Sequence, residues 1–558
     1  MPVEEGEVSV LIGGKAGEGI SSAGQVIAHL LGQLGYRVHM HFDYPSLIKG
    51  GHNFAIVRGS GRRIGAVGNR VDLLLALDQE TLRLHLPRLP AGQESGAVVY
   101  NRDTAKYPPG VGIPVAAILA AEKAPPVMGN SAILGAFVRA AGIGWPVAIG
   151  VLGKSFRKAT EQNLRVARRG YEASEERLRI PSLGLPPLPA FTGNEAMGIG
   201  LVEAGLGVYL SYPMSPTSNL MHFLAAHADE TRIRVLQPES EIAVILASLG
   251  CAYAGTRAAV GTSGGGFSLM VEALGLAGMA ELPVVIVLGQ RAGPSTGLAT
   301  YTAQADLEFA IHAGQGGFPR LVIAPGDAEE ARTWIRAAVD LAWKYQLPAL
   351  FLPDRIVCEG MYSLDPGVAP EYQAFPAPAD PGTHPYLRYA ITDSGISPLR
   401  FPPVKGEVIR VNSHAHDTDG ITTEDPGVTR DMADKRWRKM AGLAREIEGM
   451  HPVNVSGDPE GATAILCWGS NKGVCGECGE RIGLRVVQPV VLWPFPEESF
   501  AHAMKGVERV FGVETNETGQ LSSLVGRFGY RAERRILKYD GRPFMVDELE
   551  QELRRVLA

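Results

Sequence analysis

The sequence predicts an α/β protein built from several doubly wound units, and three observations carry this prediction. Residues 8–34 read as an apolar strand, a glycine-rich turn and a helix. Strands and helical stretches alternate again over residues 192–358, and once more over residues 462–558. The 68 glycines and 39 prolines suit the tight turns of such a fold.

The chain has 558 residues, which suggests about three or four domains. Composition and periodicity place a first domain at 1–180, a proline-rich linker at 181–191 and a second domain at 192–364. Over 365–457 the periodicity weakens and proline, histidine and charge increase, so we interpret this stretch as a connecting arm. A last α/β domain covers 458–558.

Charge and hydropathy exclude some functional classes. The net charge is −6, and the sequence has no strongly basic stretch, so nucleic acid is not an expected partner. No apolar run reaches the roughly 18 residues that span a membrane. The acidic N-terminus does not resemble a signal peptide, so we expect a cytoplasmic protein.

The five cysteines are too few and too scattered for a disulfide framework. Cys475 and Cys478 form a lone CxxC, which we interpret as two reduced thiols in a turn. A four-cysteine iron–sulfur or zinc site needs a second pair, so this chain is not expected to hold a cluster.

In the first domain, strands are predicted at 8–12 and 71–77, and helices at 20–34 and 163–179. The second domain has predicted strands at 207–211, 258–261, 283–288 and 321–324, with a helix over 239–254 between the first two. A basic helix is predicted near 434–439 in the arm. The last domain has predicted strands at 464–467, 490–492 and 510–513, and a closing helix from Val546.

Five features of the second domain carry candidate chemistry, and the first two are a proline loop and an acidic helix start. Residues 212–216 (YPMSP) follow a strand, where two prolines stiffen the loop and Ser215 offers a hydroxyl. An ordinary rigid turn would look the same. Glu239 and Glu241 then open a helix rich in small residues, where a carboxylate is stabilised near the helix N-terminus.

The other three features follow later strands. Residues 262–268 (TSGGGFS) form a glycine-rich turn that lets the backbone approach a flat ligand. Residues 289–297 (GQRAGPSTG) place Arg291 at a strand's C-terminal end, where it can grip a carboxylate or form a surface ion pair. Residues 304–307 (QADL) lie just beyond.

Together these motifs resemble the alpha subunits of the 2-oxoacid:ferredoxin oxidoreductases. The runs at 212–216, 262–268 and 289–297 are similar to that family's signatures for its thiamine diphosphate pyrimidine-binding domain. The first domain, with GGKAGEGI and residues 46–53, resembles the family's gamma (acceptor oxidoreductase) domain. The last resembles its transketolase-C-terminal-like domain, with residues 514–521. Ser215 and Gly265 depart from the more usual threonine and proline.

The resemblance implies thiamine diphosphate chemistry, in which a glutamate bonds the pyrimidine ring and helps to remove a proton from the cofactor. Glu241 is the expected glutamate, with Glu239 as the alternative. Arg291 is expected to meet the substrate carboxylate. The residues expected to bind the cofactor are Tyr212, Pro213, Ser215, Pro216, Gly264 and Phe267.

Three further residues, Thr296, Lys49 and His52, are candidates for contacts with substrate or coenzyme A. For Lys49 and His52, a subunit-interface loop is an equal alternative.

The resemblance also implies a partner. The family's diphosphate signature begins with GDG, which the sequence lacks, so a beta subunit is expected to supply the diphosphate half, with Mg²⁺ and a [4Fe–4S] cluster. A heterodimer or a dimer of heterodimers would convert a 2-oxoacid, coenzyme A and oxidised ferredoxin to acyl-CoA, carbon dioxide and reduced ferredoxin. The reaction can reverse, as in a reductive TCA cycle. We expect 2-oxoglutarate as substrate, with pyruvate, branched-chain and aryl 2-oxoacids as alternatives.

Two other classes remain open. Residues 412–417 (NSHAHD), expected after a strand, carry two histidines of a metal hydrolase, but the HxHxDH pattern is broken by Thr418 and Asp419. GGKAGEGI suggests a nucleotide-binding regulatory protein, but Ala16 follows Lys15 where a Walker motif needs serine or threonine. A phosphate at the helix N-terminus stays possible.

Overall fold

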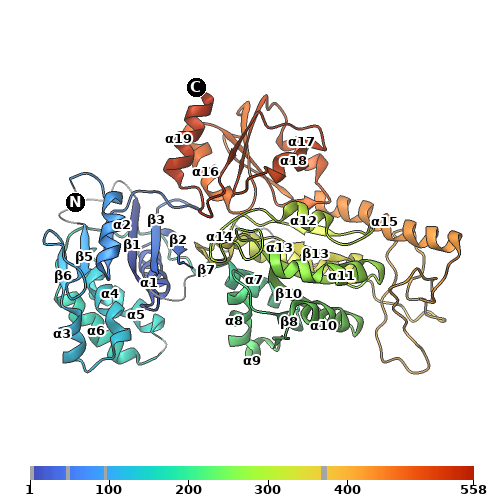
Figure 1. The fold of residues 1–558 in the computed structure, drawn as a ribbon, viewed down its shortest axis with the longest axis horizontal. Coiled ribbons are helices and arrows are strands. Elements are labelled where there is room, and N and C mark those ends of the chain that lie inside the picture. The colour runs from blue at the N-terminus through green and yellow to red at the C-terminus, as the bar shows by residue number, and fades with distance from the viewer. Residues whose placement is uncertain (1–5, 46–50, 93–96, 157, 366–373) are drawn as a thin grey trace. The chain divides into compact units, whose positions relative to one another are not determined.

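The structure is a computed structural model that describes residues 6–45, 51–92, 97–156, 158–365 and 374–558. The chain forms two compact units (Figure 1). Unit 1 comprises residues 1–192, 359–368 and 544–558, and unit 2 comprises residues 193–358 and 369–543. The predicted α/β class is confirmed, because helices and mixed or parallel sheets make up both units.

Unit 1 is built on a mixed eight-stranded sheet. Its strands, in spatial order, are β6 (Val111–Ile113), β5 (Val98–Asn101), β4 (Leu73–Ala76), β1 (Glu7–Lys15), β3 (His52–Ser60), β2 (Arg37–Asp43), β14 (Met361–Ser363) and β7 (Ala190–Thr192). β1, β4, β5 and β6 run parallel, and the pairings from β1 through β3 and β2 to β7 are antiparallel. Val10, Leu11 and Ile12 of β1 are fully buried, as an apolar central strand requires.

The helices of unit 1 are α1 (Ile20–Gln33), α2 (Gln79–His85), α3 (Val115–Ala121), α4 (Gly129–Ala140), α5 (Trp145–Ser155), α6 (Thr160–Glu172) and α19 (Val546–Leu557). The predicted strands at 8–12 and 71–77 and the helix at 20–34 are confirmed by β1, β4 and α1. The helix predicted over 163–179 ends at Glu172, so its last part is wrong. There the chain turns back, and the Arg177 and Leu178 amides both donate to the Ala140 carbonyl at 2.9 Å.

Unit 2 contains a seven-stranded sheet. Its strands, in spatial order, are β18 (Val491–Trp493), β12 (Leu321–Ile323), β13 (Pro348–Phe351), β11 (Val284–Gly289), β10 (Ala258–Ser263), β8 (Val208–Ser211) and β9 (Arg234–Leu236). All pairings are parallel except that of β18, which confirms the strands predicted from 207 to 324. Every residue of β10, β11 and β13 is buried, which explains their unbroken apolar runs.

The helices around this sheet are α7 (Gly193–Glu203), α8 (Ser218–Ala226), α9 (Ala228–Thr231), α10 (Glu241–Tyr253), α11 (Gly264–Met279), α12 (Leu307–His312), α13 (Ala328–Tyr345) and α14 (Arg355–Glu359). α10 confirms the helix predicted over 239–254, with its start moved to Glu241. Ser240 sets that start, because its hydroxyl caps the helix by accepting from the Ala243 amide at 3.3 Å.

The C-terminal segment of unit 2 adds a five-stranded sheet. Its order is β15 (Val453–Gly457), β17 (Arg485–Pro489), β16 (Thr463–Leu466), β19 (Arg509–Glu514) and β20 (Arg534–Leu537). The accompanying helices are α16 (Asn471–Ile482), α17 (Glu497–Ala503) and α18 (Gln520–Gly526). Both sheets of unit 2 line one continuous apolar core, and β18 of this segment extends the seven-stranded sheet.

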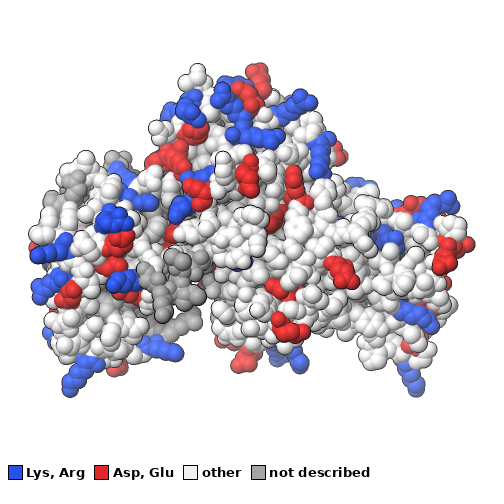
Figure 2. Space-filling model, viewed as in Figure 1, with Lys and Arg blue, Asp and Glu red and all other residues white. Residues whose placement is uncertain are grey.

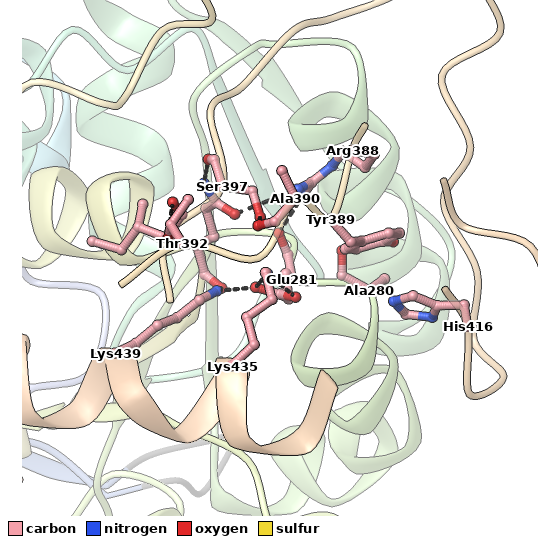
Figure 3. Close-up of polar contacts among 12 residues, drawn as sticks. Ala280, Glu281, Arg388, Tyr389, Ala390, Thr392, Ser397, His416, Lys435 and Lys439 are labelled. Atoms are coloured by element: carbon pink, nitrogen blue, oxygen red, sulfur yellow. Dashed lines mark hydrogen bonds and ion pairs between the residues drawn. The ribbon is translucent and has the colours of Figure 1, made fainter. Parts of the chain in front are cut away.

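The arm contains α15 (Pro426–Glu448), which includes the predicted basic helix. Before it, described residues 374–425 form only isolated bridges, so the strand expected before Asn412 is wrong. Two lysines of α15 are fully buried and contact one glutamate that follows α11 (Figure 3). The Lys435 ammonium donates to both Glu281 carboxylate oxygens, at 2.8 and 3.0 Å, and Lys439 donates to one of them. The arm therefore contacts the core of unit 2 through buried ion pairs between α15 and Glu281.

Figure 2 shows acidic and basic side chains interspersed over one face, with no broad basic surface among the described residues drawn there. Within the described part of the chain, no helix combines the length and apolar character needed to cross a bilayer. Among those same residues, no group of three or more histidine, cysteine, aspartate or glutamate side chains is arranged to hold a metal ion.

Candidate functional site

The five predicted motifs of the second domain gather at one edge of the seven-stranded sheet. β11, β10, β8 and β9 are adjacent and parallel, so their C-terminal ends open on the same side. The loops after these strands carry the proline loop, the start of α10, the start of α11 and Arg291. This edge is where parallel α/β sheets place ligand sites.

Glu241 is the first residue of α10, and it is only 6% exposed. Its carboxylate lies against the first turn of α11, because a Cβ built on Gly266 would be 2.8 Å from Glu241 Oε1. Among the described residues, no hydrogen bond or ion pair engages this carboxylate. The carboxylate is therefore available to a ligand that donates a hydrogen bond at this edge of the sheet. Glu239 lies before the helix and is exposed.

The proline loop follows β8 and is held by side chains beneath it. Asn194 at the start of α7 donates from Nδ2 to the Pro216 carbonyl at 3.0 Å, and the Thr217 hydroxyl donates to the Met214 carbonyl at 3.0 Å. Pro216 is buried, whereas Pro213 and Ser215 are partly exposed and Tyr212 is 40% exposed. The sequence reasoning missed Asn194, whose buried position after a short strand gave no separate signal.

Arg291 joins the loop after β11 to the proline loop. One guanidinium NH donates to the Ser215 carbonyl at 3.2 Å, and the residue is partly exposed. Thr296 lies further along, in an exposed turn closed by a bridge between Ala292 and Leu298. The structure thus brings Arg291 and Ser215 together and leaves Thr296 at the surface.

The glycine-rich run is a helix start and not the turn that was predicted. β10 continues to Ser263, and Gly264, Gly265 and Gly266 form the first turn of α11. Gly264 is partly exposed at this end. Phe267 is fully buried, with its ring edge-on to Phe309 at a centroid distance of 4.9 Å, so the structure places it in the core below the site.

Asp306, from the fifth motif, lies at the other side of this helix start. A Cβ built on Gly264 would be 2.8 Å from Asp306 Oδ1, and the Asp306 amide donates to Gln290 Oε1 at 3.2 Å. Burial raises the pKa of Asp306 to about 6, and the positive charge of Arg291 opposes that rise. The sequence analysis singled out the QADL motif, which contains Asp306, but assigned no role to this residue.

The loop between β11 and α12 is fixed by Gln304, which is fully buried. Gln304 Nε2 donates to the Trp468 carbonyl at 2.7 Å and to Asp354 at 3.2 Å, while Gln304 Oε1 accepts from Asn471 at 2.8 Å and from the Thr515 amide at 3.0 Å. The C-terminal segment therefore helps to hold the loop that carries Arg291 and Asp306.

In unit 1, Lys49 lies outside the described residues. His52 begins β3, and its Nε2 is 2.8 Å from His85 Nε2. Burial lowers the pKa of both rings, that of His85 to about 3, so this pair is neutral at neutral pH.

The side chain of Glu18 fills the turn that follows β1. Glu18 Oε2 accepts from the Lys15 amide at 2.7 Å and occupies the space beside Gly14. A phosphate would need amides such as this one, so the turn does not favour the nucleotide-binding alternative.

The remaining candidates have structural surroundings. His416 is buried, its Nδ1 is 2.8 Å from the His414 carbonyl, and its ring packs on Tyr389 at 3.9 Å. Cys475 and Cys478 lie on α16 and are buried, so the turn expected around them is wrong. Burial and neighbouring Cys467 raise the pKa of Cys475, which keeps it a thiol.

Comparison with known families gives two matches. Residues 199–434 match the family described as pyruvate flavodoxin/ferredoxin oxidoreductase, thiamine diP-binding, and residues 9–173 match pyruvate ferredoxin/flavodoxin oxidoreductase. The chain is 31% identical to a Sulfolobus 2-oxoacid:ferredoxin oxidoreductase subunit alpha, over 99% of this chain and 97% of that protein. It is 30% identical to the alpha subunit of a second such enzyme from Aeropyrum pernix, with 99% and 98% coverage.

Among solved structures, the chain is similar to 2-oxoglutarate:ferredoxin oxidoreductase from Magnetococcus marinus, which was solved with 2-oxoglutarate, coenzyme A and succinyl-CoA bound. The TM-score is 0.88, the identity is 26%, and both chains are covered completely.

Proposed function

Because the chain belongs to the alpha subunits of the 2-oxoacid:ferredoxin oxidoreductases, we propose that it supplies the pyrimidine half of a shared thiamine diphosphate site in a complex that oxidises 2-oxoglutarate. The observation that carries the proposal is the buried Glu241 carboxylate, which has no hydrogen bond or ion pair among the described residues. The proposal keeps the predicted division of the chain into a first domain at 1–180, a linker at 181–191, a second domain at 192–364, an arm at 365–457 and a last domain at 458–558.

The residues at the sheet edge fit the pyrimidine part of this cofactor. Gly264 and Gly266 leave the start of α11 without side chains, and Tyr212, Pro213 and Ser215 are accessible beside it. When bound, thiamine diphosphate supplies the nucleophilic carbon that attacks the 2-oxoacid. Glu241 would hold a proton shared with a pyrimidine nitrogen, and burial makes that hydrogen bond strong because water cannot compete for it.

Arg291 would bind the substrate carboxylate. A guanidinium presents paired N–H donors that match a carboxylate, and one of its N–H groups already fixes the side chain on the Ser215 carbonyl. Thr296, Lys49 and His52 remain candidates for contacts with substrate or coenzyme A. Phe267 would act from below, because it supports the first turn of α11 from the core.

A beta subunit would complete the site with the diphosphate half, Mg²⁺ and the [4Fe–4S] cluster, and ferredoxin would accept the electrons.

Large apolar side chains next to Glu241 support docking of this subunit, since Ile242 and Leu246 on α10 and Leu269 on α11 are 46–52% exposed. Ile242 directly follows Glu241 on α10, so this surface adjoins the proposed site. A Leu246→Asp variant should co-purify less partner, whereas Val127→Asp, at an exposed apolar position of unit 1, should not. Equal recovery of the partner with both variants would contradict this docking surface.

The choice of 2-oxoglutarate rests on similarity. The solved relative, covered over its whole length, has 2-oxoglutarate bound, and a Mycobacterium tuberculosis protein named 2-oxoglutarate oxidoreductase subunit KorA is 32% identical over 69% of this chain. Pyruvate and branched-chain or aryl 2-oxoacids are the alternatives.

The test is to co-express the chain with its partner, purify the complex and measure reduction of ferredoxin with coenzyme A and each 2-oxoacid. The proposal expects turnover only in the complex, with the highest kcat/KM for 2-oxoglutarate. Turnover by the isolated chain would contradict the shared site, and a higher kcat/KM for pyruvate would contradict the substrate.

A further inference from the structure

Two neighbouring carbonyl groups of the proline loop are each bound by a side chain from another element. Arg291, in the loop after β11, donates to the Ser215 carbonyl at 3.2 Å. Asn194, at the start of α7, donates from Nδ2 to the Pro216 carbonyl at 3.0 Å. Proline has no N–H group, so a loop with two prolines in five residues has fewer backbone donors with which to hold itself. Its geometry therefore depends on side chains such as these.

The Asn194 side chain is arranged for this hydrogen bond. The residue is 1% exposed, and in the described part of the chain its Oδ1 is buried without a hydrogen-bond partner. A buried amide destabilises the fold when one of its polar atoms is left unpaired, whereas a leucine of similar size would not. The Nδ2 donor is therefore the property that distinguishes asparagine at this position.

Both ends of the hydrogen bond are anchored in unit 2. A Cβ built on Gly193 would lie 1.9 Å from the Val357 carbonyl oxygen, so the residue before Asn194 packs directly against the backbone of α14. A Cβ built on Gly289 would lie 2.9 Å from two ring carbons of Pro216, so the loop packs on the end of β11. A donor on such a fixed backbone can set the position of the group that it binds.

We propose that Asn194 is a positioning residue that, by holding the Pro216 carbonyl, fixes the adjoining Ser215 carbonyl and so places Arg291 to receive the substrate carboxylate. This inference rests on the proposed function, in which Arg291 binds the 2-oxoacid. Arg291 has a further contact, and Asn194 acts only on the part of its orientation that the Ser215 carbonyl sets. Displacing a binding group by about 1 Å can lower catalysis roughly a hundredfold, so a second anchor on this loop has a measurable effect.

The first test is Asn194→Leu in the assembled complex, which removes the donor and keeps the approximate size of the side chain. We expect kcat/KM for the 2-oxoacid to fall roughly tenfold to a hundredfold, mainly through a higher KM. Tyr209→Phe is the matched control, because it removes from β8 a buried hydroxyl that has no hydrogen-bond partner among the described residues. This control should leave kcat and KM unchanged.

Asn194→Asp separates the hydrogen bond from the packing. A protonated carboxyl group can donate to the Pro216 carbonyl, whereas a carboxylate can only accept and would repel it. Burial raises the pKa of such a carboxyl group, so kcat/KM of this variant relative to the wild-type complex should rise as the pH falls from about 9 to about 6. Asn194→Leu should show no such recovery. A relative loss that is the same at every pH in both variants would overturn the inference.

A double-mutant cycle of Asn194→Leu with Arg291→Lys shows whether Asn194 acts through Arg291. The losses in kcat/KM should be non-additive, with a coupling of roughly threefold or more, and additive losses would overturn the inference. Recovery of the partner subunit at the wild-type level excludes misfolding, and the pH dependence of Asn194→Asp provides the test if the leucine variant does not fold. If the unmodified complex oxidises no 2-oxoacid, the proposed function fails and this inference fails with it, whereas additive losses in an active complex refute the inference alone.

Discussion

Replacing Glu281 by glutamine should destabilise unit 2 strongly. The substitution keeps the shape of the side chain but removes the carboxylate that both Lys435 and Lys439 contact, and all three residues are at most 1% exposed (Figure 3). Removing one partner of a buried ion pair costs about 3–5 kcal/mol, because the remaining charge stays in a medium of low polarity.

The cost should depend on pH, since burial lowers the pKa of Lys439 to about 7. At pH 8 Lys439 is mostly neutral, and the loss should be near about 3 kcal/mol. At pH 6 both lysines are charged in the wild-type protein, and the loss should be larger by up to about 1.4 kcal/mol. At roughly 2 °C per kcal/mol for a large domain, the lower figure corresponds to a fall in Tm of about 6 °C.

Lys439→Met is the matched variant, because it removes one ammonium and leaves the Glu281–Lys435 pair. The folded pKa of Lys439 lies below its ordinary 10.5, so the unfolded chain binds more protons between about pH 7 and 10.5. The wild-type free energy of unfolding should therefore gain up to about 1.4 kcal/mol per pH unit from this group as pH rises above 7. Lys439→Met should lack that gain.

Urea unfolding followed by tryptophan fluorescence measures these differences, since five of the six tryptophans belong to unit 2. A loss below about 1 kcal/mol for Glu281→Gln at pH 6 would refute the ion-pair reasoning. An unchanged pH dependence in Lys439→Met would refute the assignment of the titrating group.

Two further predictions concern the candidate site. Glu241→Gln should lower kcat of the complex by a factor of about 10²–10⁴, the usual contribution of a proton-transfer group. Glu239→Gln should have little effect on steady-state turnover. Equal losses in the two variants would show that burial does not identify the glutamate that contacts the cofactor. Gly266→Ala should weaken thiamine diphosphate binding measured by calorimetry, because the added Cβ would meet the Thr262 hydroxyl and, at 2.8 Å, the Glu241 carboxylate. Gly265→Ala points into open space and should bind normally. Similar affinities for both alanine variants would contradict the placement of Glu241.

Local patterns in the sequence predicted most of the strands, because apolar runs ending in glycine or proline mark buried parallel strands without any long-range information. They failed where distant contacts decide the structure. The helix predicted to Arg179 ends at Glu172, and the chain after it turns back to Ala140, distant in sequence, whose carbonyl accepts the Arg177 and Leu178 amides. Cys475 and Cys478 lie on a helix because packing against the last sheet overrides the low helix propensity of the three glycines in α16.

The candidate site was predictable in part for the same reason. Proline and glycine motifs located Ser215, Gly264 and Arg291, but they could not tell whether a side chain points to the ligand edge or into the core. Phe267 looked like its neighbours in sequence, yet its position on the inner side of α11 buries it completely. Asn194 depends on a contact across the fold that no local pattern records, and the QADL motif included Asp306 without showing that its side chain lies beside Gly264.

The side-chain amide of Gln304 makes the structure of the candidate site depend on the C-terminal segment of the chain. Trp468, Asn471 and Thr515 all bond to it, so a chain truncated before the five-stranded sheet would keep all five motifs of the second domain and yet lose the groups that fix the Arg291 loop. Exchanging the C-terminal segment between related enzymes would then change substrate selection without altering one residue that touches the substrate.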